Sequence, residues 1–236
     1  MKRFKGVMTV LFTMLLFAVV GSMFVNTDAH AFINEPLKFI MDNGSGAHLA
    51  FCAFSAAPLT WADGSENMGG FRNYIFAIPI SDITTEAALP GNPTTSAEHV
   101  TLVGNHTLAN GKYFKKIYCT GGTVKYTPEN QGEVDGQSFK QKGAFFFPGS
   151  GDDVNAFARQ VNNGNFILIL VEENGKRVQV GSKGHPARIK PAPDFGAAAA
   201  DRKGFNFEFE ADSFVAALRY NGTIPLSESE SEEAIS

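Results

Sequence analysis

The sequence predicts a mostly β domain, either an antiparallel β-sandwich or a barrel, with one packed α-helix. Segments rich in aromatic and β-branched residues, about nine in number, alternate along the chain with turns made of Gly, Asn and Pro. Apolar residues recur at helical spacing most clearly at about residues 152–163. The 22 Phe residues of the chain favour a core dominated by aromatic rings.

The clearest strand signals lie in the second half of the chain. Residues 166–171 are all apolar, which is typical of a strand buried on both faces. The dipeptide Asn174-Gly175 follows and favours a hairpin with 176–180 as the returning strand. Over 204–210, Phe alternates with Asn or Glu, which indicates one buried and one wet face. Further strand signals, with Asn110-Gly111 as a second hairpin turn, cover residues 49–54, 71–80, 98–108, 112–119, 123–127, 138–147 and 188–190.

The predicted helix at 152–163 has an apolar stripe and plausible ends. Its core-facing residues are spaced i, i+3, i+4 and i+7, and they are Val154, Phe157, Ala158 and Val161. Ser150 and Asp152 offer oxygen atoms for the N-cap, and Asp152 and Asp153 place negative charge in the first turn. Gly164 is placed to take the left-handed C′ position.

The N-terminal segment, residues 1–31, predicts a signal-like apolar helix. It has a basic start, a long apolar run and the triplet Ala29-His30-Ala31, which together are typical of a secretory signal peptide. We expect cleavage between Ala31 and Phe32. The apolar run is also long enough to span a bilayer, so an uncleaved membrane anchor is the alternative. Contact with a membrane is expected only through residues 1–31, and only if they are retained.

The remainder of the chain is expected to form a single β domain, residues 32–226, followed by a tail. Residues 227–236 contain four Glu and no basic residue, which predicts a disordered, solvated acidic tail. The chain has a formal net charge of −4. A modestly acidic chain lacks the clustered Lys and Arg that phosphate contacts need, so we expect no sequence-specific binding of nucleic acid.

The two cysteines, Cys52 and Cys119, allow two interpretations. In an exported protein they could form a disulfide, and in a reducing compartment they would be two small core residues. Sequence gives no separation between their Cα atoms, so both alternatives stay open.

The sequence offers no convincing catalytic, cofactor or metal site. His99 and His106 are seven residues apart, which fits no common metal-ligand spacing, and we expect both to be exposed loop residues. His185 also lies in a loop, without an evident carboxylate partner. Residues 181–184 lack the full phosphate-loop pattern and are interpreted as a turn. The carboxylates that could in principle form an acid–base pair, but are expected to be solvated, are Glu129, Glu133 and Asp135.

The second half of the chain resembles a family of bacteriophage virion structural proteins of tail-tube type. The resemblance rests on the order of GKYFKKIY (111–118), QGEVDGQSF (131–139), FFFPG (145–149), FAR with VNN (157–163) and ADRKG (200–204). It implies a β subunit that stacks in rings with copies of itself, that meets other virion proteins, and that has no catalytic residues. The Glu side of strand 204–210 would then suit an acidic surface along which DNA slides, because like charges repel.

Two other functions are compatible with the sequence. An exported periplasmic, cell-surface or secreted β-domain that binds a carbohydrate or protein partner is the main alternative. An exported hydrolase is the weaker one, because no site supports it. Under the first interpretation the protein is located in the virion, and under the others it is exported.

The N-terminal prediction is testable by mass spectrometry of the protein purified from expressing cells. Because small residues at 29 and 31 fit the signal peptidase, we expect Phe32 to be the first residue of the mature chain. A protein that starts at Met1 and stays with the membrane fraction would instead identify residues 1–31 as an anchor.

Overall fold

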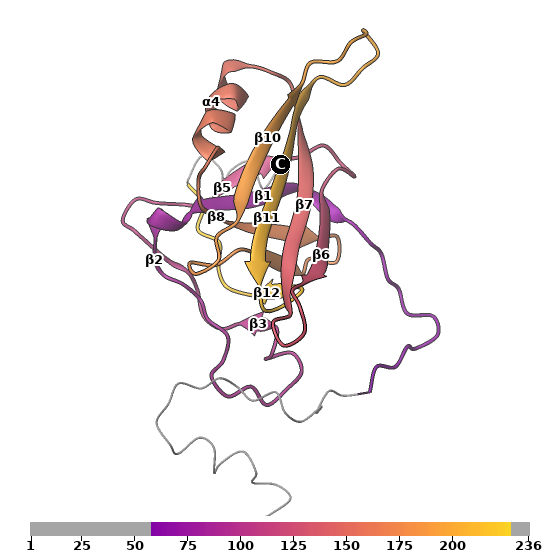
Figure 1. Cartoon of the computed structure of the whole chain (residues 1–236), viewed down its shortest axis with the longest axis vertical. Helices are drawn as coiled ribbons and strands as arrows, with labels where there is room; N and C mark the ends of the chain where they lie inside the picture. The colour runs from indigo at the N-terminus through magenta and orange to yellow at the C-terminus, as the bar shows by residue number, and fades with distance from the viewer. Residues whose placement is uncertain (1–57, 228–236) are drawn as a thin grey trace, which may run out of the picture. The chain divides into compact units, whose positions relative to one another are not determined.

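The computed structural model describes residues 58–227 (Figure 1). Four sequence predictions lie outside this range: the apolar N-terminal helix, the cleavage position at Ala31 and Phe32, the strand at 49–54, and the tail from residue 228 onward. In the described part of the chain, no helix is long and apolar enough to cross a bilayer.

The described residues form mostly β structure with a single α-helix, as the sequence predicts. A six-stranded sheet has the order β3 (Thr101–Leu102), β12 (Leu218–Tyr220), β9 (Arg177–Val180), β8 (Phe166–Glu172), β1 (Phe71–Pro79) and β5 (Lys115–Tyr118). A four-stranded antiparallel sheet has the order β10 (Arg188–Asp194), β11 (Gly204–Ser213), β7 (Ser138–Pro148) and β6 (Lys125–Gln131). The remaining elements are β2 (Ile83–Thr85) paired with β4 (Thr107–Leu108), the 3-10 turn η1 (Ile80–Asp82) and the helix α4 (Asp152–Val161). The sheets are not closed into a barrel, so the barrel alternative is wrong.

The first core brings together side chains from both large sheets and from α4. Phe205, Phe207 and Phe209 on β11 are all buried, which confirms the alternation predicted for this strand. Phe145 on β7 stacks on Phe207 with ring centres 5.0 Å apart. Phe157 of α4 meets Phe207 edge-on at 5.5 Å. Each fully buried Phe stabilises the fold by roughly 1.5–3 kcal/mol, so this ring cluster is a main source of cohesion.

Strand β8 is buried on both faces, also as predicted. Leu168 and Leu170 enter the first core. Ile167 and Ile169 enter a second core on the other face of the six-stranded sheet, where they pack with residues such as Phe114 and Tyr220. Among residues 58–227, no further large sheet lies over this second core. The segments around β2–β4 and after β12 contribute other side chains to it.

The helix α4 has the predicted buried stripe, but its N-terminus has no side-chain cap. The N-cap residue is Gly151, which has no side chain to offer, so the expected caps Ser150 and Asp152 are wrong. The side chain of Asn155 instead donates from Nδ2 to the carbonyl oxygens of Ser150 and Gly151, at 3.1 and 2.8 Å. The side chain of Asn155, in the first turn of α4, therefore holds residues 150 and 151 in place just before the helix.

The C-terminal end of α4 also departs from the prediction. Asn163, at φ +62°, takes the left-handed conformation expected of Gly164. Asn tolerates this region better than most residues. Gly164 is needed for a different reason: a Cβ there would lie 2.4 Å from the ring of Phe166.

One hairpin prediction is confirmed and one is wrong. Asn174-Gly175 turns β8 into antiparallel β9, with Gly175 at φ +83°. Asn110-Gly111 forms a turn but no hairpin, because β4 pairs with β2 and β5 pairs with β1. The partner of β5 is chosen by packing: Ile117 lies opposite Ile75, at the edge of the first core.

Gly143 allows the ring of Phe209 and the backbone of β6 to approach β7 closely. It lies on β7 opposite Phe209 of β11 and Tyr126 of β6. A Cβ at this position would lie 2.2 Å from the ring of Phe209 and 2.3 Å from the carbonyl oxygen of Lys125. The ring could move, but the carbonyl is backbone and is held in the sheet.

We therefore expect Gly143→Ala to lower the free energy of unfolding by about 1–3 kcal/mol, the usual range for overpacking. Urea denaturation followed by tryptophan fluorescence or circular dichroism measures this change. Gly121→Ala is the matched control, because a Cβ at Gly121 meets nothing within 4 Å. Equal stability of the two variants would contradict the close approach at Gly143.

Candidate functional site

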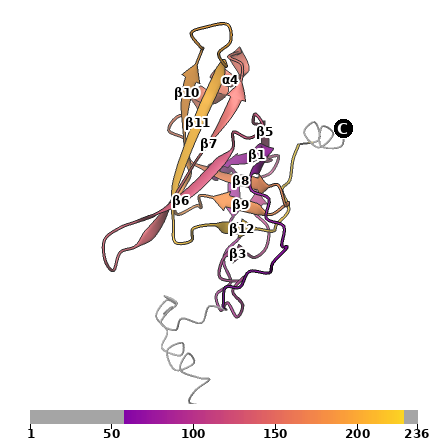
Figure 2. The ribbon, with the colours of Figure 1, turned by 90° about the vertical axis from the view of Figure 1, so that its right-hand side faces the viewer.

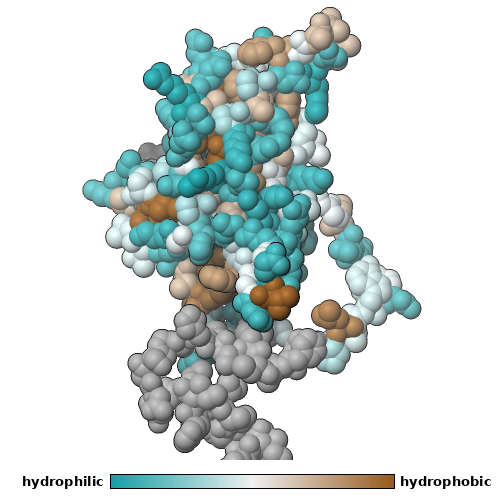
Figure 3. Space-filling model, viewed as in Figure 1, coloured by the Kyte–Doolittle hydropathy of each residue, from teal (hydrophilic) through white to brown (hydrophobic). Residues whose placement is uncertain are grey.

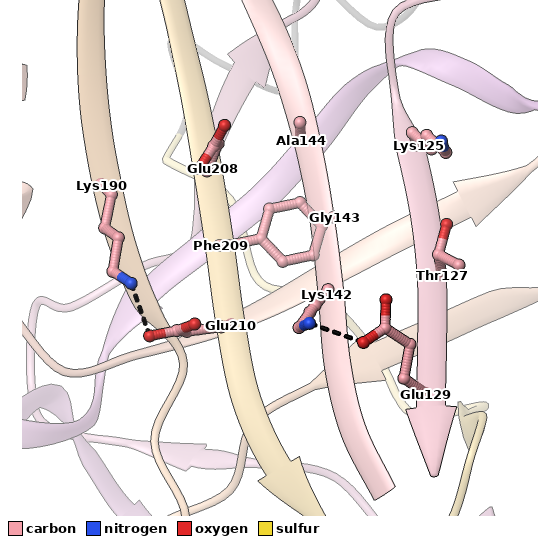
Figure 4. Close-up of a pocket in the computed structure, with 10 residues that line it drawn as sticks. All are labelled: Lys125, Thr127, Glu129, Lys142, Gly143, Ala144, Lys190, Glu208, Phe209 and Glu210. Atoms are coloured by element: carbon pink, nitrogen blue, oxygen red, sulfur yellow. Dashed lines mark hydrogen bonds and ion pairs between the residues drawn. The ribbon is translucent and has the colours of Figure 1, made fainter. Parts of the chain in front are cut away.

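The outer face of the four-stranded sheet carries charged side chains in cross-strand contact (Figure 4). The ammonium of Lys190 lies 2.7 Å from a carboxylate oxygen of Glu210. Lys140 lies 3.5 Å from the other oxygen of the same carboxylate. Lys142 reaches Glu129 at 2.6 Å. The hydrogen bond from Lys190 and the charge of Lys140 hold the pKa of Glu210 below its ordinary value.

The sign of charge on this face alternates from strand to strand. The outward residues that register places side by side are Arg188 and Lys190 on β10, Glu208, Glu210 and Asp212 on β11, and Lys140 and Lys142 on β7. The acidic row of β11 is thus flanked by basic rows on both sides. The expectation that this strand forms an acidic surface is wrong, because its neighbours neutralise it.

A shallow depression of about 420 Å³ lies on the same face. Its lining includes Lys125, Thr127 and Ala144 besides the paired charges (Figure 4). In Figure 3, which views the molecule from the same side as Figure 1, the surface is mostly hydrophilic over this sheet. The face is therefore wet, nearly balanced in charge, and without a deep cavity.

The hairpin of β10 and β11 projects past the rest of the two sheets (Figures 1 and 2). Its tip exposes Phe195, which is 61% accessible, and a run of exposed alanines at 197–200. Pale brown atoms mark an apolar tip in Figure 3. The four alanines at 197–200 do not by themselves indicate an exposed apolar surface, so the sequence analysis missed this tip.

The tip is held by its own hydrogen bonds. The carboxylate of Asp201 accepts from the amides of Ala197 and Ala198 at 2.9 and 2.8 Å. These backbone bonds lower the pKa of Asp201. Asp194 accepts from the amide of Gly196 at 3.0 Å. Asp194 and Asp201, on either side of the alanines, are the sequence feature from which an ordered loop could have been predicted.

A groove of about 520 Å³ lies between α4 and the end of β1. Apolar side chains of Pro79, Ile80, Phe157 and Phe166 line much of it, together with Lys183. More of the groove's lining is apolar than polar. It is wide enough for one aromatic side chain or a small ligand.

The structure does not bring the candidate catalytic and metal-binding residues of the sequence analysis together in a single site. Glu129 pairs with Lys142, whereas Glu133 and Asp135 are exposed in the loop between β6 and β7. His185 is exposed and meets Phe214 edge-on. Residues 181–184 form a turn between β9 and β10, as expected. Within residues 58–227, no group of three or more His, Cys, Asp or Glu side chains could hold a metal ion.

A disulfide between Cys52 and Cys119 remains a prediction. Cys119 is fully buried in the first core, and burial raises the pKa of its thiol to about 12. Cys52 lies outside the described residues, so its pairing with Cys119 is not tested.

His106 is the clearest correction among the histidines. It is 4% accessible rather than exposed, and its ring stacks on Tyr220 at 4.6 Å between ring centres. Nδ1 accepts from the amide of Ala87 at 3.3 Å, so the ring hydrogen sits on Nε2 and is donated to Oε1 of Gln179 at 2.9 Å. Nothing in the local sequence marks this position, because its partners come from distant segments.

No protein-family model, no curated protein and no solved structure matches this chain.

Because the imidazole of His106 is buried in its neutral form, the free energy of unfolding should depend on pH. Burial lowers the pKa of the imidazole from its ordinary value of 6.5, although Gln179 and Glu86 oppose the shift. Above that value the folded and unfolded chains both hold a neutral ring. As the pH falls below about 6.5, the unfolded chain takes up a proton that the folded chain does not, so the free energy of unfolding decreases.

We expect this residue to contribute a loss of up to about 1.4 kcal/mol per pH unit below pH 6.5, ending at its lowered pKa in the folded chain. Urea denaturation at several pH values between 5 and 7.5 measures it. His106→Gln should flatten the slope, whereas His185→Gln, at an exposed ring, serves as control. An unchanged slope in His106→Gln would contradict this assignment.

Proposed function

We propose that the protein is a non-enzymatic structural subunit, a β-sandwich that assembles with copies of itself in the manner of phage tail-tube proteins. Its partners would be other copies and other virion proteins, and its location the virion. The observation that supports this proposal best is the apolar tip of the β10–β11 hairpin. Its own hydrogen bonds hold it in shape, and its exposed apolar side chains could be buried against another molecule.

The tip and the α4 groove are complementary in character. Phe195 and the alanines at 197–200 are exposed apolar groups on a projection, and the groove beside Phe157 and Phe166 is an apolar concavity. Two different surfaces that fit each other give a head-to-tail contact, which closes into a ring or continues as a filament. This is the geometry that a tube requires.

The charged face of the four-stranded sheet also suits contact between copies. Its alternating rows place acidic side chains between basic ones. A second copy displaced by one strand would place the acidic row of β11 against a basic row of the first copy. Such complementarity contributes more to specificity than to affinity, because exposed ion pairs are individually weak.

The shifted ionisable groups support a structural role rather than a catalytic one. The backbone amide of His106 donates to the Tyr220 hydroxyl at 3.3 Å, and this hydroxyl donates to the carbonyl of Thr223 at 2.9 Å. The Tyr126 hydroxyl donates to the carbonyl of Ala216 at 2.5 Å. Burial raises the pKa of both tyrosines. Each of these groups is engaged in holding segments together.

The alternative is an exported β-domain that binds a carbohydrate or a protein partner. The α4 groove, at about 520 Å³, is the observation that favours it. Under this alternative the groove receives a ligand and the protein stays monomeric.

Electron microscopy in negative stain, combined with sedimentation at increasing protein concentration, tests the proposal. We expect the purified full-length protein to form rings or tubes. Phe195→Ser should raise the concentration needed for half-assembly about tenfold or more, because burying a Phe contributes roughly 1.5–3 kcal/mol.

Phe214→Ser is the matched control, since Phe214 is even more exposed, at 79%, but lies away from the hairpin tip. It should assemble like the unaltered protein. A monomer at every concentration would favour the binding domain, and equal effects of the two substitutions would rule out a special role for Phe195.

A further inference from the structure

Residues 83–108, which carry β2, β3 and β4, cover part of the second core and are called the cover segment below. The segment buries few apolar side chains, namely Ile83, Ala87 and Leu102. Within residues 58–227, it pairs with the rest of the six-stranded sheet only through the two residues of β3. A segment with so little buried apolar surface belongs to the part of a fold that opens most easily. Its polar contacts therefore matter for holding it in place.

His106 lies at the centre of the polar contacts that join the cover segment to the sheet. Its ring donates from Nε2 to Oε1 of Gln179 on β9, at 2.9 Å. Its backbone amide donates to the hydroxyl of Tyr220 on β12, at 3.3 Å. Nδ1 accepts from the backbone amide of Ala87, at 3.3 Å. The residue thus connects two parts of the cover segment with two strands of the sheet.

A second set of contacts continues from Gln179 through Glu86. The side chain of Gln179 is fully buried, and its Nε2 donates to the carboxylate of Glu86 at 3.3 Å. The other oxygen of this carboxylate accepts from the backbone amide of Lys183, at 2.8 Å. The ammonium of Lys183 donates to the carbonyl of Thr84, at 3.1 Å. Because Thr84 and Glu86 belong to the cover segment, these contacts attach it to the turn after β9.

The surroundings of the His106 ring favour its neutral form. Burial lowers the pKa of the imidazole, against the opposing effect of the Glu86 carboxylate. Tyr220 stacks on the ring at 4.6 Å, and burial raises the pKa of its hydroxyl, so it is a neutral neighbour. The ring of Phe114 lies 6.1 Å away. The guanidinium of Arg177, 5.9 Å from the centre of the Tyr220 ring, adds positive charge to this neighbourhood.

Protonation of His106 would break one of its contacts. Both ring nitrogens of an imidazolium carry hydrogen. Nδ1 would then direct its hydrogen at the amide hydrogen of Ala87, so two donors would face each other at a site that now holds a hydrogen bond. Nε2 remains a donor, so the contact with Gln179 does not compensate for this loss. The conflict is relieved when the Ala87 part of the cover segment moves away from the ring.

We propose that His106 is a pH-sensitive switch whose protonation releases the cover segment from β9 and β12, while the first core stays folded. Release uncovers part of the apolar face that contains Ile167 and Ile169 of β8, both fully buried when the segment is in place. The four-stranded sheet and α4 take no part, because their buried side chains lie in the first core. The switch does not depend on whether the protein assembles with copies of itself.

Amide hydrogen exchange measured by NMR between pH 7.5 and pH 5 tests the proposal. The reporters are the amides of Ala87, of His106, and of Arg219, which donates to Val100 of the cover segment. Below about pH 6.5 their protection factors should fall by up to about tenfold per pH unit, because opening takes up one proton. They should stay below that of Phe207 and change little in low urea, since release of one segment exposes little surface. Protection and urea dependence equal to those of Phe207 would show that the whole fold opens together, and would overturn the proposal.

Two histidine substitutions form a matched pair. His106→Gln removes the titrating ring, so the protection of Ala87 and Arg219 should no longer depend on pH in this range. His185→Gln is the control, because its ring is exposed, and it should behave like the unaltered protein. An equal loss of protection with falling pH in both variants would overturn the assignment of the switch to His106.

The tautomer of His106 gives a test in the unaltered protein. A neutral imidazole carries one hydrogen, and long-range nitrogen–proton NMR spectra show which ring nitrogen holds it. At pH 7.5 we expect the hydrogen on Nε2. A hydrogen on Nδ1 would mean that no acceptor is lost on protonation, and would overturn the proposal even if His106→Gln failed to fold.

Discussion

The burial of β8 on both faces is the constraint on which the rest of the structure depends. Its even and odd residues enter different cores, so each face of the six-stranded sheet must be covered. One cover is the four-stranded sheet with its Phe cluster and α4. The other is built from the segments around β2 and β4 and from the residues after β12. The chain returns to this sheet after β12, where Leu226 forms a bridge with Phe114.

Features with a local period could be predicted from the sequence. The apolar run at 166–171, the alternation at 204–210 and the stripe of α4 each stand in one short segment, and the structure confirms all three. The pairing of β5 with β1 and the short strand β12 could not, because their partners are distant in sequence. The turn residues Asn110-Gly111 wrongly predicted a hairpin, because the following strand, β5, packs and pairs with β1 instead.

The candidate surfaces were harder to predict than the core. The acidic residues of β11 suggest a negative face when that strand is considered alone, and only the register with β7 and β10 reveals the balancing lysines. His106 has no local mark of burial, since Ala87, Gln179 and Tyr220 come together around it only in the folded chain. Sequence patterns report which face of a strand is apolar, but not what lies beside its polar face.

The parallel pairing of β3 with β12 has a consequence for the order of folding. Arg219 meets Thr101 from more than a hundred residues later in the chain, and β9 needs β12 as its second neighbour. Contacts of such long sequence separation form slowly, and this one cannot begin until nearly all of the polypeptide has been synthesised. The hairpins β6–β7, β8–β9 and β10–β11, whose strands are adjacent in sequence, can therefore form first, and the pairing of β3 with β12 completes the six-stranded sheet last.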